Sequence, residues 1–271
     1  VKDSSEIPMI IAIDQEGGKV QRLSSLTKPS ATDIPDMFTL GSTNNSKLAK
    51  EVGKVMAQEL LTIGVNVAFA PVLDIKGKNS FIGERCFGDN PQTVTKMAIN
   101  FARGLEQNNV VATYKHFPGH GDTETDSHKE LPIINKSLKA LKSHEFVPFK
   151  KAIANDAKII MVGHIALPKV TGDKTPASLS KKIVNDILIE QLNYDGLIVT
   201  DALDMGAITE YYTQEEMYVM AVEAGCDILL MPKSPKKAIA TIKKNISEER
   251  IDKSVKKILK FKNPKISASS V

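Results

Sequence analysis

Short apolar runs alternate with helix-period segments along almost all of this 271-residue chain. Six runs have the length of buried strands, and each is followed by a polar or Gly/Pro-containing stretch and then by a segment of helical periodicity. The six runs are Met9–Ile13, Val65–Ala70, Val110–Thr113, Ile159–Val162, Leu197–Thr200 and Ile228–Met231. Helices are expected at 48–63, 92–108, 137–155, 181–193, 214–224, 235–246 and 248–261. Repeated βα units predict an α/β protein with a parallel sheet.

Polar side chains follow all of these strands except the last, which ends at a proline. These strand-end residues are Asp14, Asp74, Lys115 with His116, His164, Asp201 and Pro232. An open doubly wound sheet gathers its site at one switch point, whereas a barrel collects residues from many strand ends. The distribution therefore favours a TIM-like (βα)8 barrel.

The number of strands does not complete such a barrel. Eight strands are needed and six are found, and no strand-and-helix pair precedes Met9. We therefore expect residues 1–271 to form a single TIM-barrel-like catalytic domain without the first two βα units, either because the chain is an N-terminally truncated piece or because its barrel is incomplete. An open sheet of this kind exposes edges that invite association.

Composition excludes several classes of protein. Apolar residues make up 42% and charged residues 25% of the chain, which is ordinary for a globular protein. No run approaches the ~18–20 apolar residues of a membrane span, and no signal-peptide pattern opens the chain. The charge of +4 comes from lysines spread over helix faces without interleaved aromatic residues, so nucleic-acid binding is not expected. Two cysteines are too few for a disulfide framework.

The segment 114–131, YKHFPGHGDTETDSHKEL, holds three of the five histidines of the chain. It follows the apolar run Val110–Thr113, and Pro118, Gly119 and Gly121 predict turns and not a helix. Titratable side chains gathered after a strand are typical of active sites in parallel α/β proteins. The segment is therefore interpreted as part of a functional site.

The stretch KHFPGHGDTETDSHKELP resembles the signature of glycoside hydrolase family 3, in the branch of bacterial β-N-acetylhexosaminidases that act on cell-wall fragments. The resemblance extends from about residue 8 to about residue 262. It implies a barrel with two strands before the one that matches Met9–Ile13. Some members of the family carry a catalytic glutamate on a second domain, but a histidine-aspartate pair in this chain favours the single-domain branch. No cofactor and no metal are expected.

The resemblance also implies catalytic residues. Asp201, which ends the strand Leu197–Thr200 in LIVTDALDMGAI, matches the nucleophile; Asp204 is its near neighbour but comes later after the strand. In Asp126-Ser127-His128 the histidine matches the general acid/base and the aspartate its partner. Imidazole suits this role because it titrates near neutral pH, and a nearby carboxylate orients the ring. A neutral base also repels anions less than a carboxylate would, so phosphate is conceivable as an acceptor.

Further residues are implied to bind the sugar. By resemblance, Asp14, Arg22, Arg85, Lys115 and His116 contact the glycosyl unit in the first subsite, and Met205 lines its floor. For the two arginines the alternative is a structural salt bridge, with Asp74 or Glu84 as partner. His120 is expected to shape its loop, while His164 either lines the site or satisfies backbone carbonyls.

The function expected from these residues is that of a retaining exo-β-N-acetylglucosaminidase, which hydrolyses terminal β-linked GlcNAc from peptidoglycan-derived muropeptides or related glycans. Alternatives are a catalytically inactive sugar-binding fragment, a GlcNAc phosphorylase that uses the same residues, and a metal hydrolase built on His116 and His120. Four-residue spacing in a Pro/Gly loop does not place two histidines on one helix face, which disfavours the metal hydrolase. A cytoplasmic location is expected, with export to the cell wall as the alternative; the aglycone and the oligomeric state stay open.

Overall fold

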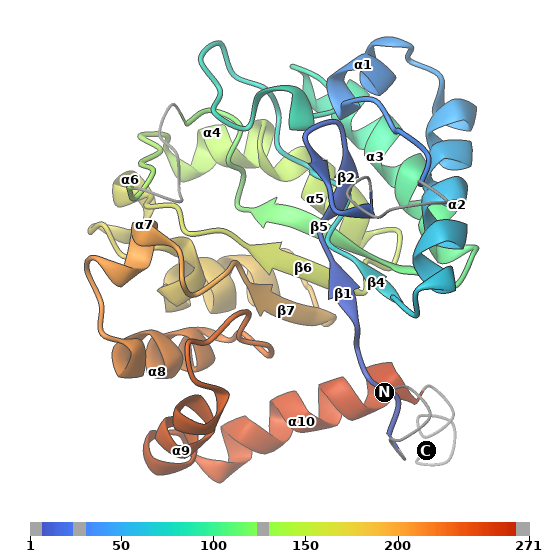
Figure 1. The fold of residues 1–271 in the computed structure, drawn as a ribbon. Coiled ribbons are helices and arrows are strands. Elements are labelled where there is room, and N and C mark those ends of the chain that lie inside the picture. Colours follow the sequence, from blue (N-terminus) through green and yellow to red (C-terminus); the bar gives the residue numbers. More distant parts are fainter. Residues whose placement is uncertain (1–6, 24–30, 124–129, 264–271) are drawn as a thin grey trace.

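A parallel sheet forms the centre of the computed structural model, which describes residues 7–23, 31–123 and 130–263. Its strands follow chain order: β1 (Ala12–Ile13), β4 (Val67–Ala68), β5 (Val111–Phe117), β6 (Ile159–Val162) and β7 (Leu197–Thr200). The segment at Ile228 continues the sheet through a parallel bridge to Val199. The sheet curls as part of a TIM-like barrel (Figure 1), so the predicted fold class is confirmed.

The first two strands are shorter than their apolar runs predicted. A side chain replaces a backbone partner at this end of the sheet: the Ile11 N–H donates to Asn66 Oδ1, and Asn66 Nδ2 donates to the Met9 carbonyl, both at 2.8 Å. The Asn66 amide therefore continues the pairing between the two strands where their ladder stops.

Strand β5 is longer than predicted and contains both Lys115 and His116, which the sequence placed in a loop. Its backbone pairs on both sides: the Leu73 N–H donates to the Lys115 carbonyl at 2.6 Å, and the Gly163 N–H donates to the Phe117 carbonyl at 2.9 Å. A segment paired on both sides stays extended, so the loop begins only at Pro118.

Both faces of the sheet are covered. Ile160 and Val162 face the larger core, whereas Ile159 and Met161 face a smaller apolar cluster against which Ile258 of the last helix packs. Alternation of this kind is expected for strands buried on both faces. The helices and helical turns are α1 (Met37–Ser42), α2 (Ser46–Thr62), η3 (Gly83–Arg85), α3 (Pro91–Glu106), α4 (Leu138–Ser143), α5 (Phe146–Ile153), α6 (Pro168–Thr171), η4 (Ala177–Leu179), the π-helix η5 (Lys182–Gln191), α7 (Gly206–Thr209), α8 (Gln214–Ala224), α9 (Pro235–Asn245) and α10 (Glu248–Lys262).

The predicted helix 137–155 is wrong, because the chain forms α4 and α5 instead. Proline lacks the N–H that a helix interior needs, but it is tolerated in the first turn. Interrupting the helix at His144 and Glu145 places Pro148 in the first turn of α5. The other predicted helices are present, and Ser247 caps α10 by accepting a hydrogen bond from the Arg250 N–H.

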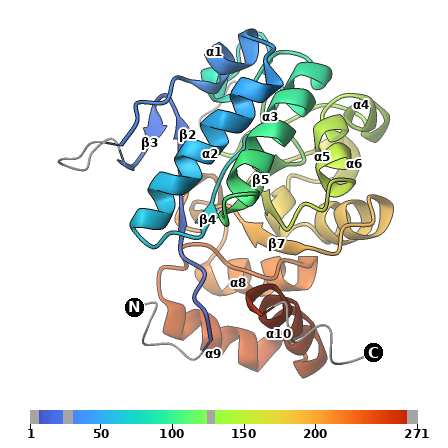
Figure 2. The ribbon, with the colours of Figure 1, turned by 90° about the vertical axis from the view of Figure 1, so that its right-hand side faces the viewer.

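Helices α2 and α3 lie side by side against the sheet (Figure 2) and touch through glycines. A Cβ atom at Gly53 would lie 2.1 Å from the Phe101 carbonyl oxygen, and one at Gly104 would lie 2.1 Å from that of Lys50. The two backbones therefore approach more closely than any larger residue allows.

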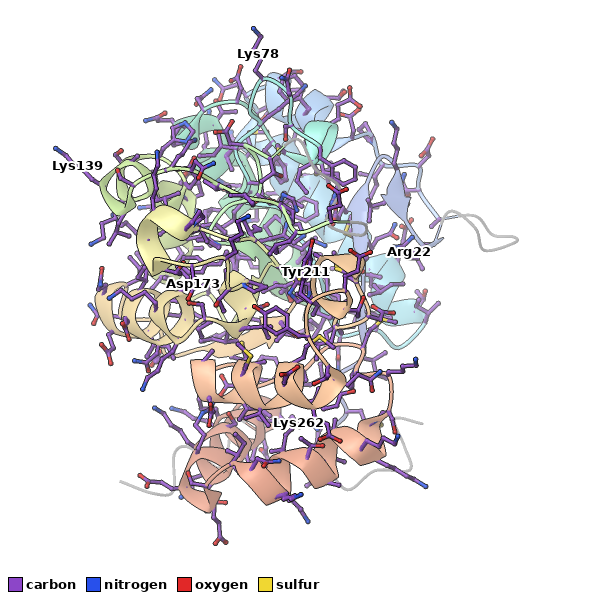
Figure 3. The ribbon with its side chains drawn as sticks, turned by 90° about the vertical axis from the view of Figure 1, so that its left-hand side faces the viewer. Arg22, Lys78, Lys139, Asp173, Tyr211 and Lys262 are labelled. Carbon is purple, nitrogen blue, oxygen red and sulfur yellow. The ribbon has the colours of Figure 1, made fainter. Side chains whose placement is uncertain are left out.

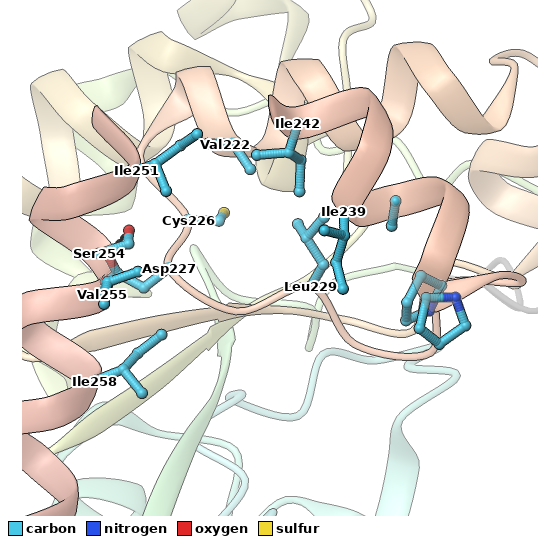
Figure 4. A pocket seen from close by; sticks show the side chains of 13 residues that line it. Val222, Cys226, Asp227, Leu229, Ile239, Ile242, Ile251, Ser254, Val255 and Ile258 are labelled. Carbon is cyan, nitrogen blue, oxygen red and sulfur yellow. Dashed lines mark hydrogen bonds between the residues drawn. The ribbon is translucent and has the colours of Figure 1, made fainter. Parts of the chain in front are cut away.

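An apolar pocket of about 280 Å³ lies between α8, α9 and α10 (Figure 4). Val222, Ile239, Ile242 and Val255 are among the side chains that line it. None of the polar strand-end residues lines this pocket. Over the described ranges, every helix is too short or too polar to cross a membrane.

Candidate active site

The carboxyl ends of the parallel strands bring the polar residues predicted from the sequence to one edge of the sheet. Asp14 follows β1, Lys115 and His116 lie just before the last residue of β5, and Asp201 follows β7. Parallel strands all deliver their carboxyl ends to the same side, which explains why residues so distant in sequence meet here.

Lys115 lies at the centre of the cluster and is almost completely buried. Its Nζ is 2.5 Å from Glu16 Oε1 and 2.8 Å from Asp14 Oδ1. The Arg85 guanidinium binds the same Glu16 carboxylate through Nε and Nη2, each at 2.8 Å. Glu16 thus binds both cations, while the Asp14 side chain, which binds Lys115, is 39% exposed.

The charges of this cluster stabilise one another in a buried setting. Burial alone would raise the pKa of Glu16, but Lys115 and Arg85 lower it to about 2. Burial would lower the pKa of Lys115, yet Glu16 and Asp14 raise it above its usual value. Glu16, Lys115 and Arg85 are therefore ionised at neutral pH.

The position of Glu16 depends on a hairpin that the sequence did not predict. Strands β2 (Gln15–Gly17) and β3 (Val20–Gln21) pair antiparallel directly after β1. Gly17 and Gly18 have positive φ angles of 116° and 55°, which favour glycine at this turn. The proposed salt-bridge partners of Arg85 were wrong: Glu16 is its partner, and Glu84 is exposed.

A second group of hydrogen bonds fixes the His116 ring. His116 Nδ1 is 2.7 Å from Asp74 Oδ2, and Arg85 Nη2 is 3.5 Å from Nε2. Asp74 Oδ1 also accepts from the His120 N–H at 2.7 Å. Since a carboxylate can only accept, Nδ1 carries a proton and Nε2 faces the arginine.

Asp201 is the carboxylate that follows β7, and nearby charged groups act on it. Its N–H donates to the Val162 carbonyl at 2.9 Å, and its Oδ1 accepts from the Ala202 N–H at 2.8 Å. Burial would raise the pKa of Asp201, but His116, His164, the Ala202 N–H and Lys115 bring it below the ordinary value. Asp201 is therefore an ionised, fixed carboxylate at the strand end.

Other predicted residues lie at different places. Met205 is buried in the turn that follows Asp201, and its N–H donates to the Ala202 carbonyl at 3.2 Å. Arg22 is exposed directly after β3 (Figure 3), in contrast to Arg85 and Lys115. Asp126 and His128 lie outside the described residues.

The histidine pair considered as a metal site is bound to protein atoms. His120 Nδ1 lies 2.5 Å from Thr123 Oγ1, a contact within its own loop, while His116 Nδ1 faces Asp74. Within 7–23, 31–123 and 130–263, no three His, Cys, Asp or Glu side chains are grouped in a way that could hold a metal ion.

A curled parallel sheet with a half-buried carboxylate, a fixed histidine and two cations at its carboxyl edge defines an α/β protein of TIM-barrel type with a strand-end site. Residues 1–261 match the family described as "Glycosyl hydrolase family 3 N terminal domain". The chain belongs to this family.

Curated relatives and solved structures give the same result. Beta-hexosaminidase A of Pseudoalteromonas piscicida is 34% identical over 85% of this chain and 41% of its own length. The beta-hexosaminidase of Nitrosomonas eutropha is 36% identical over 85% of this chain and 67% of its own length. A family 3 beta-N-acetylglucosaminidase from Paenibacillus sp. str. FPU-7 superimposes with a TM-score of 0.88 at 39% identity, covering 96% of this chain and 51% of that one. The chain thus spans between about two fifths and two thirds of these relatives.

Proposed function

We propose that this chain carries the sugar-cleaving site of a β-N-acetylhexosaminidase, which removes terminal β-linked GlcNAc from muropeptides or related glycans with retention of configuration. The observation that carries the proposal is the Asp201 carboxylate, ionised and fixed at the end of β7 within reach of the fields of His116, Lys115 and Arg85. The names of the relatives support the substrate class.

In the first step the Asp201 carboxylate attacks the anomeric carbon and forms a glycosyl ester, while the bond to the aglycone oxygen breaks. His128 gives its proton to that oxygen, so the aglycone leaves as an alcohol. In the second step water attacks the anomeric carbon, His128 takes the proton from the water, and Asp201 is released as a carboxylate. The pair Asp126 and His128 is assigned this role by its sequence motif.

The cluster around Glu16 supplies groups that form hydrogen bonds with sugar hydroxyls. Arg85 and Lys115 are donors only, whereas the Asp14 carboxylate is an acceptor. Because Glu16 fixes both cations, they present their remaining N–H groups in a set direction. Fixed donors and acceptors of this kind distinguish one hydroxyl pattern from another.

Mass spectrometry after reaction with a fluorinated GlcNAc analogue tests the proposal, because a slowly hydrolysed ester accumulates on the nucleophile. The added mass is expected on the peptide that contains Asp201. Asp201→Asn should abolish the label, and Asp204→Asn, which changes an exposed neighbour, should keep it. Hydrolysis without any ester, or an ester on Asp204, would contradict the assignment. GlcNAc, and not its 1-phosphate, is expected as the product in phosphate buffer.

A further inference from the structure

His164 is a buried histidine at the end of β6 that the proposed reaction leaves without a role. Its side chain is fully buried, two residues after the last residue of the strand, Val162. His164 Nε2 lies 2.9 Å from the Ala202 carbonyl oxygen, and Nδ1 lies 2.7 Å from Ser178 Oγ. The ring therefore connects the turn after β7 with η4.

The partners of the ring decide which nitrogen carries the proton. A carbonyl oxygen can only accept, so Nε2 carries the hydrogen and donates it to Ala202. The Ser178 hydroxyl can donate, and it gives its hydrogen to Nδ1. Both nitrogens of a neutral ring are thereby satisfied. Burial lowers the pKa of His164, which agrees with a ring that stays neutral.

The Ala202 peptide is held from both sides. Its N–H donates to Asp201 Oδ1 at 2.8 Å, while its carbonyl oxygen accepts from His164 Nε2 and, at 3.2 Å, from the Met205 N–H. The N–H and the carbonyl belong to two neighbouring planar peptide units that meet at the Ala202 Cα. A hydrogen bond to the carbonyl therefore restricts the φ and ψ rotations of Ala202 and, through them, the position of the N–H that holds the Asp201 carboxylate.

We infer that His164 is a positioning residue for Asp201: it fixes the Ala202 backbone through the carbonyl, so that the Ala202 N–H holds the Asp201 carboxylate in the orientation needed for attack on the sugar. This inference rests on the proposed function of Asp201 as nucleophile. His164 itself contacts protein groups at both nitrogens and is buried, so its effect on the reaction passes through the peptide.

Ser178 supports the same arrangement from η4. Its hydroxyl fixes the ring, and its own carbonyl accepts a hydrogen bond from Cys226 Sγ at 3.5 Å. A ring without a partner at Nδ1 could rotate or exchange its proton between nitrogens. The serine therefore belongs to the same positioning unit as the histidine.

Substitution of His164 in the full chain tests the inference with an aryl GlcNAc substrate. His164→Phe keeps a ring but removes the donor to Ala202, and kcat should fall about 10- to 100-fold, since small misplacement of a reacting group has effects of this size. KM should change less than about threefold, because the groups proposed to bind the sugar are untouched. His164→Gln, whose amide can still donate to the carbonyl, should recover most of the lost kcat.

His144, whose side chain is 44% exposed, provides the matched control: His144→Phe makes the same substitution and should leave both kinetic constants unchanged. Loss of kcat in His164→Phe without rescue by His164→Gln, or an equal effect on kcat and KM, would overturn the inference. A kcat equal to that of the parent would also overturn it.

Ser178→Ala gives a second test, and its effect on the parent does not depend on the folding of a buried His-to-Phe variant. It should lower kcat about 3- to 10-fold in the parent and have no further effect in His164→Phe, because coupled groups are not additive. Additive effects would contradict a shared unit. If the parent neither hydrolyses the substrate nor forms the fluorosugar ester, the proposed function is overturned and this inference with it. If the parent is active and the variants are fully active too, only the inference is overturned.

Discussion

Arg85 and Glu16, 69 residues apart, share two hydrogen bonds of 2.8 Å between guanidinium and carboxylate. The paired geometry is the strong, direction-setting form of this interaction. The same carboxylate binds Lys115, so one buried anion orders two cations that come from η3 and β5. Glu16 is thus the residue around which the two cations proposed to bind the sugar are arranged.

Glu16→Gln should therefore destabilise the protein and loosen sugar binding. Removing one partner of a buried ion pair leaves the other charge uncompensated, which costs about 3–5 kcal/mol of unfolding free energy. Denaturant unfolding measures this loss, and titration with GlcNAc should show weaker affinity. Glu84→Gln, at an exposed position next to Arg85, is the control and should stay within about 0.5 kcal/mol of the parent. A Glu16→Gln variant as stable as the control would show that the ion pairs contribute nothing.

Asp201→Ala should abolish turnover while sugar binding persists. The variant loses the attacking oxygen but keeps Lys115 and Arg85, so kcat should fall at least about a thousandfold, and the affinity for GlcNAc should change only about threefold. Steady-state kinetics and calorimetric titration separate these effects. Asp204→Ala serves as the neighbour control. Comparable rates in Asp201→Ala and the parent would remove Asp201 from the mechanism.

His128→Ala should slow substrates unequally. A poor leaving group needs a proton as its bond breaks, so its hydrolysis should slow by about 10²–10⁴-fold. An activated aryl glycoside needs little protonation and should be slowed much less in its first step. The test is to measure the rates of hydrolysis of both substrate types in the parent, in His128→Ala and in the control His144→Ala. Equal slowing of both types would argue against an acid role.

The buried His120 should make stability depend on pH. Burial, together with the neighbouring His116, lowers the pKa of His120 to about 4, from an ordinary value of 6.5. The folded state thus binds this proton less readily than the unfolded chain. The contribution of neutral His120 to the free energy of unfolding is therefore fully present above pH 6.5. About 3 kcal/mol of it is lost as the pH falls from 6.5 to about 4.

Denaturant unfolding at several pH values between 6.5 and about 4 measures how steeply the free energy of unfolding changes with pH. His120→Asn removes the titrating ring, keeps a polar group near Thr123, and should flatten the curve. His144→Asn, at a half-exposed histidine, should leave it as steep as in the parent. An unchanged slope in His120→Asn would mean that other groups govern the acid response.

Gly104→Ala should destabilise the contact between α2 and α3, although alanine is the better helix former by about 1 kcal/mol. The added methyl group would lie 2.1 Å from the Lys50 carbonyl oxygen, so the helices must separate, at a cost of about 1–3 kcal/mol. Thermal and denaturant unfolding would show the loss. Asn100→Ala on the same helix should change stability by less than about 0.5 kcal/mol. A stabilised Gly104→Ala variant would contradict the close contact.

Much of the sheet could be predicted from the chain, because strands buried on both faces are short continuous apolar runs. The ends of strands were less certain. β5 continues through Lys115 and His116, which look like loop residues when read alone, because the pairing of Lys115 with Val72 and of Phe117 with Val162 is a tertiary effect. Pro148 was the local signal that the predicted helix 137–155 should divide.

The site residue that sequence reasoning missed is Glu16. Asp14 and Glu16 are two positions apart in IDQEGG, and in an extended segment residues with this spacing face the same side. A lysine buried at a strand end also needs anions nearby. Together, these two signals could have indicated that both carboxylates meet Lys115. Residues 126 and 128 were assigned by motif, and their role stays a prediction.

The ion pairs of Glu16 with Arg85 and Lys115 are complete before any sugar arrives. The conformational entropy of these two long cationic side chains is therefore lost on folding, and little of it remains to be lost when a ligand binds. Crystals grown without ligand should consequently take up a soaked monosaccharide without cracking, because the region around these ion pairs would not rearrange within the lattice.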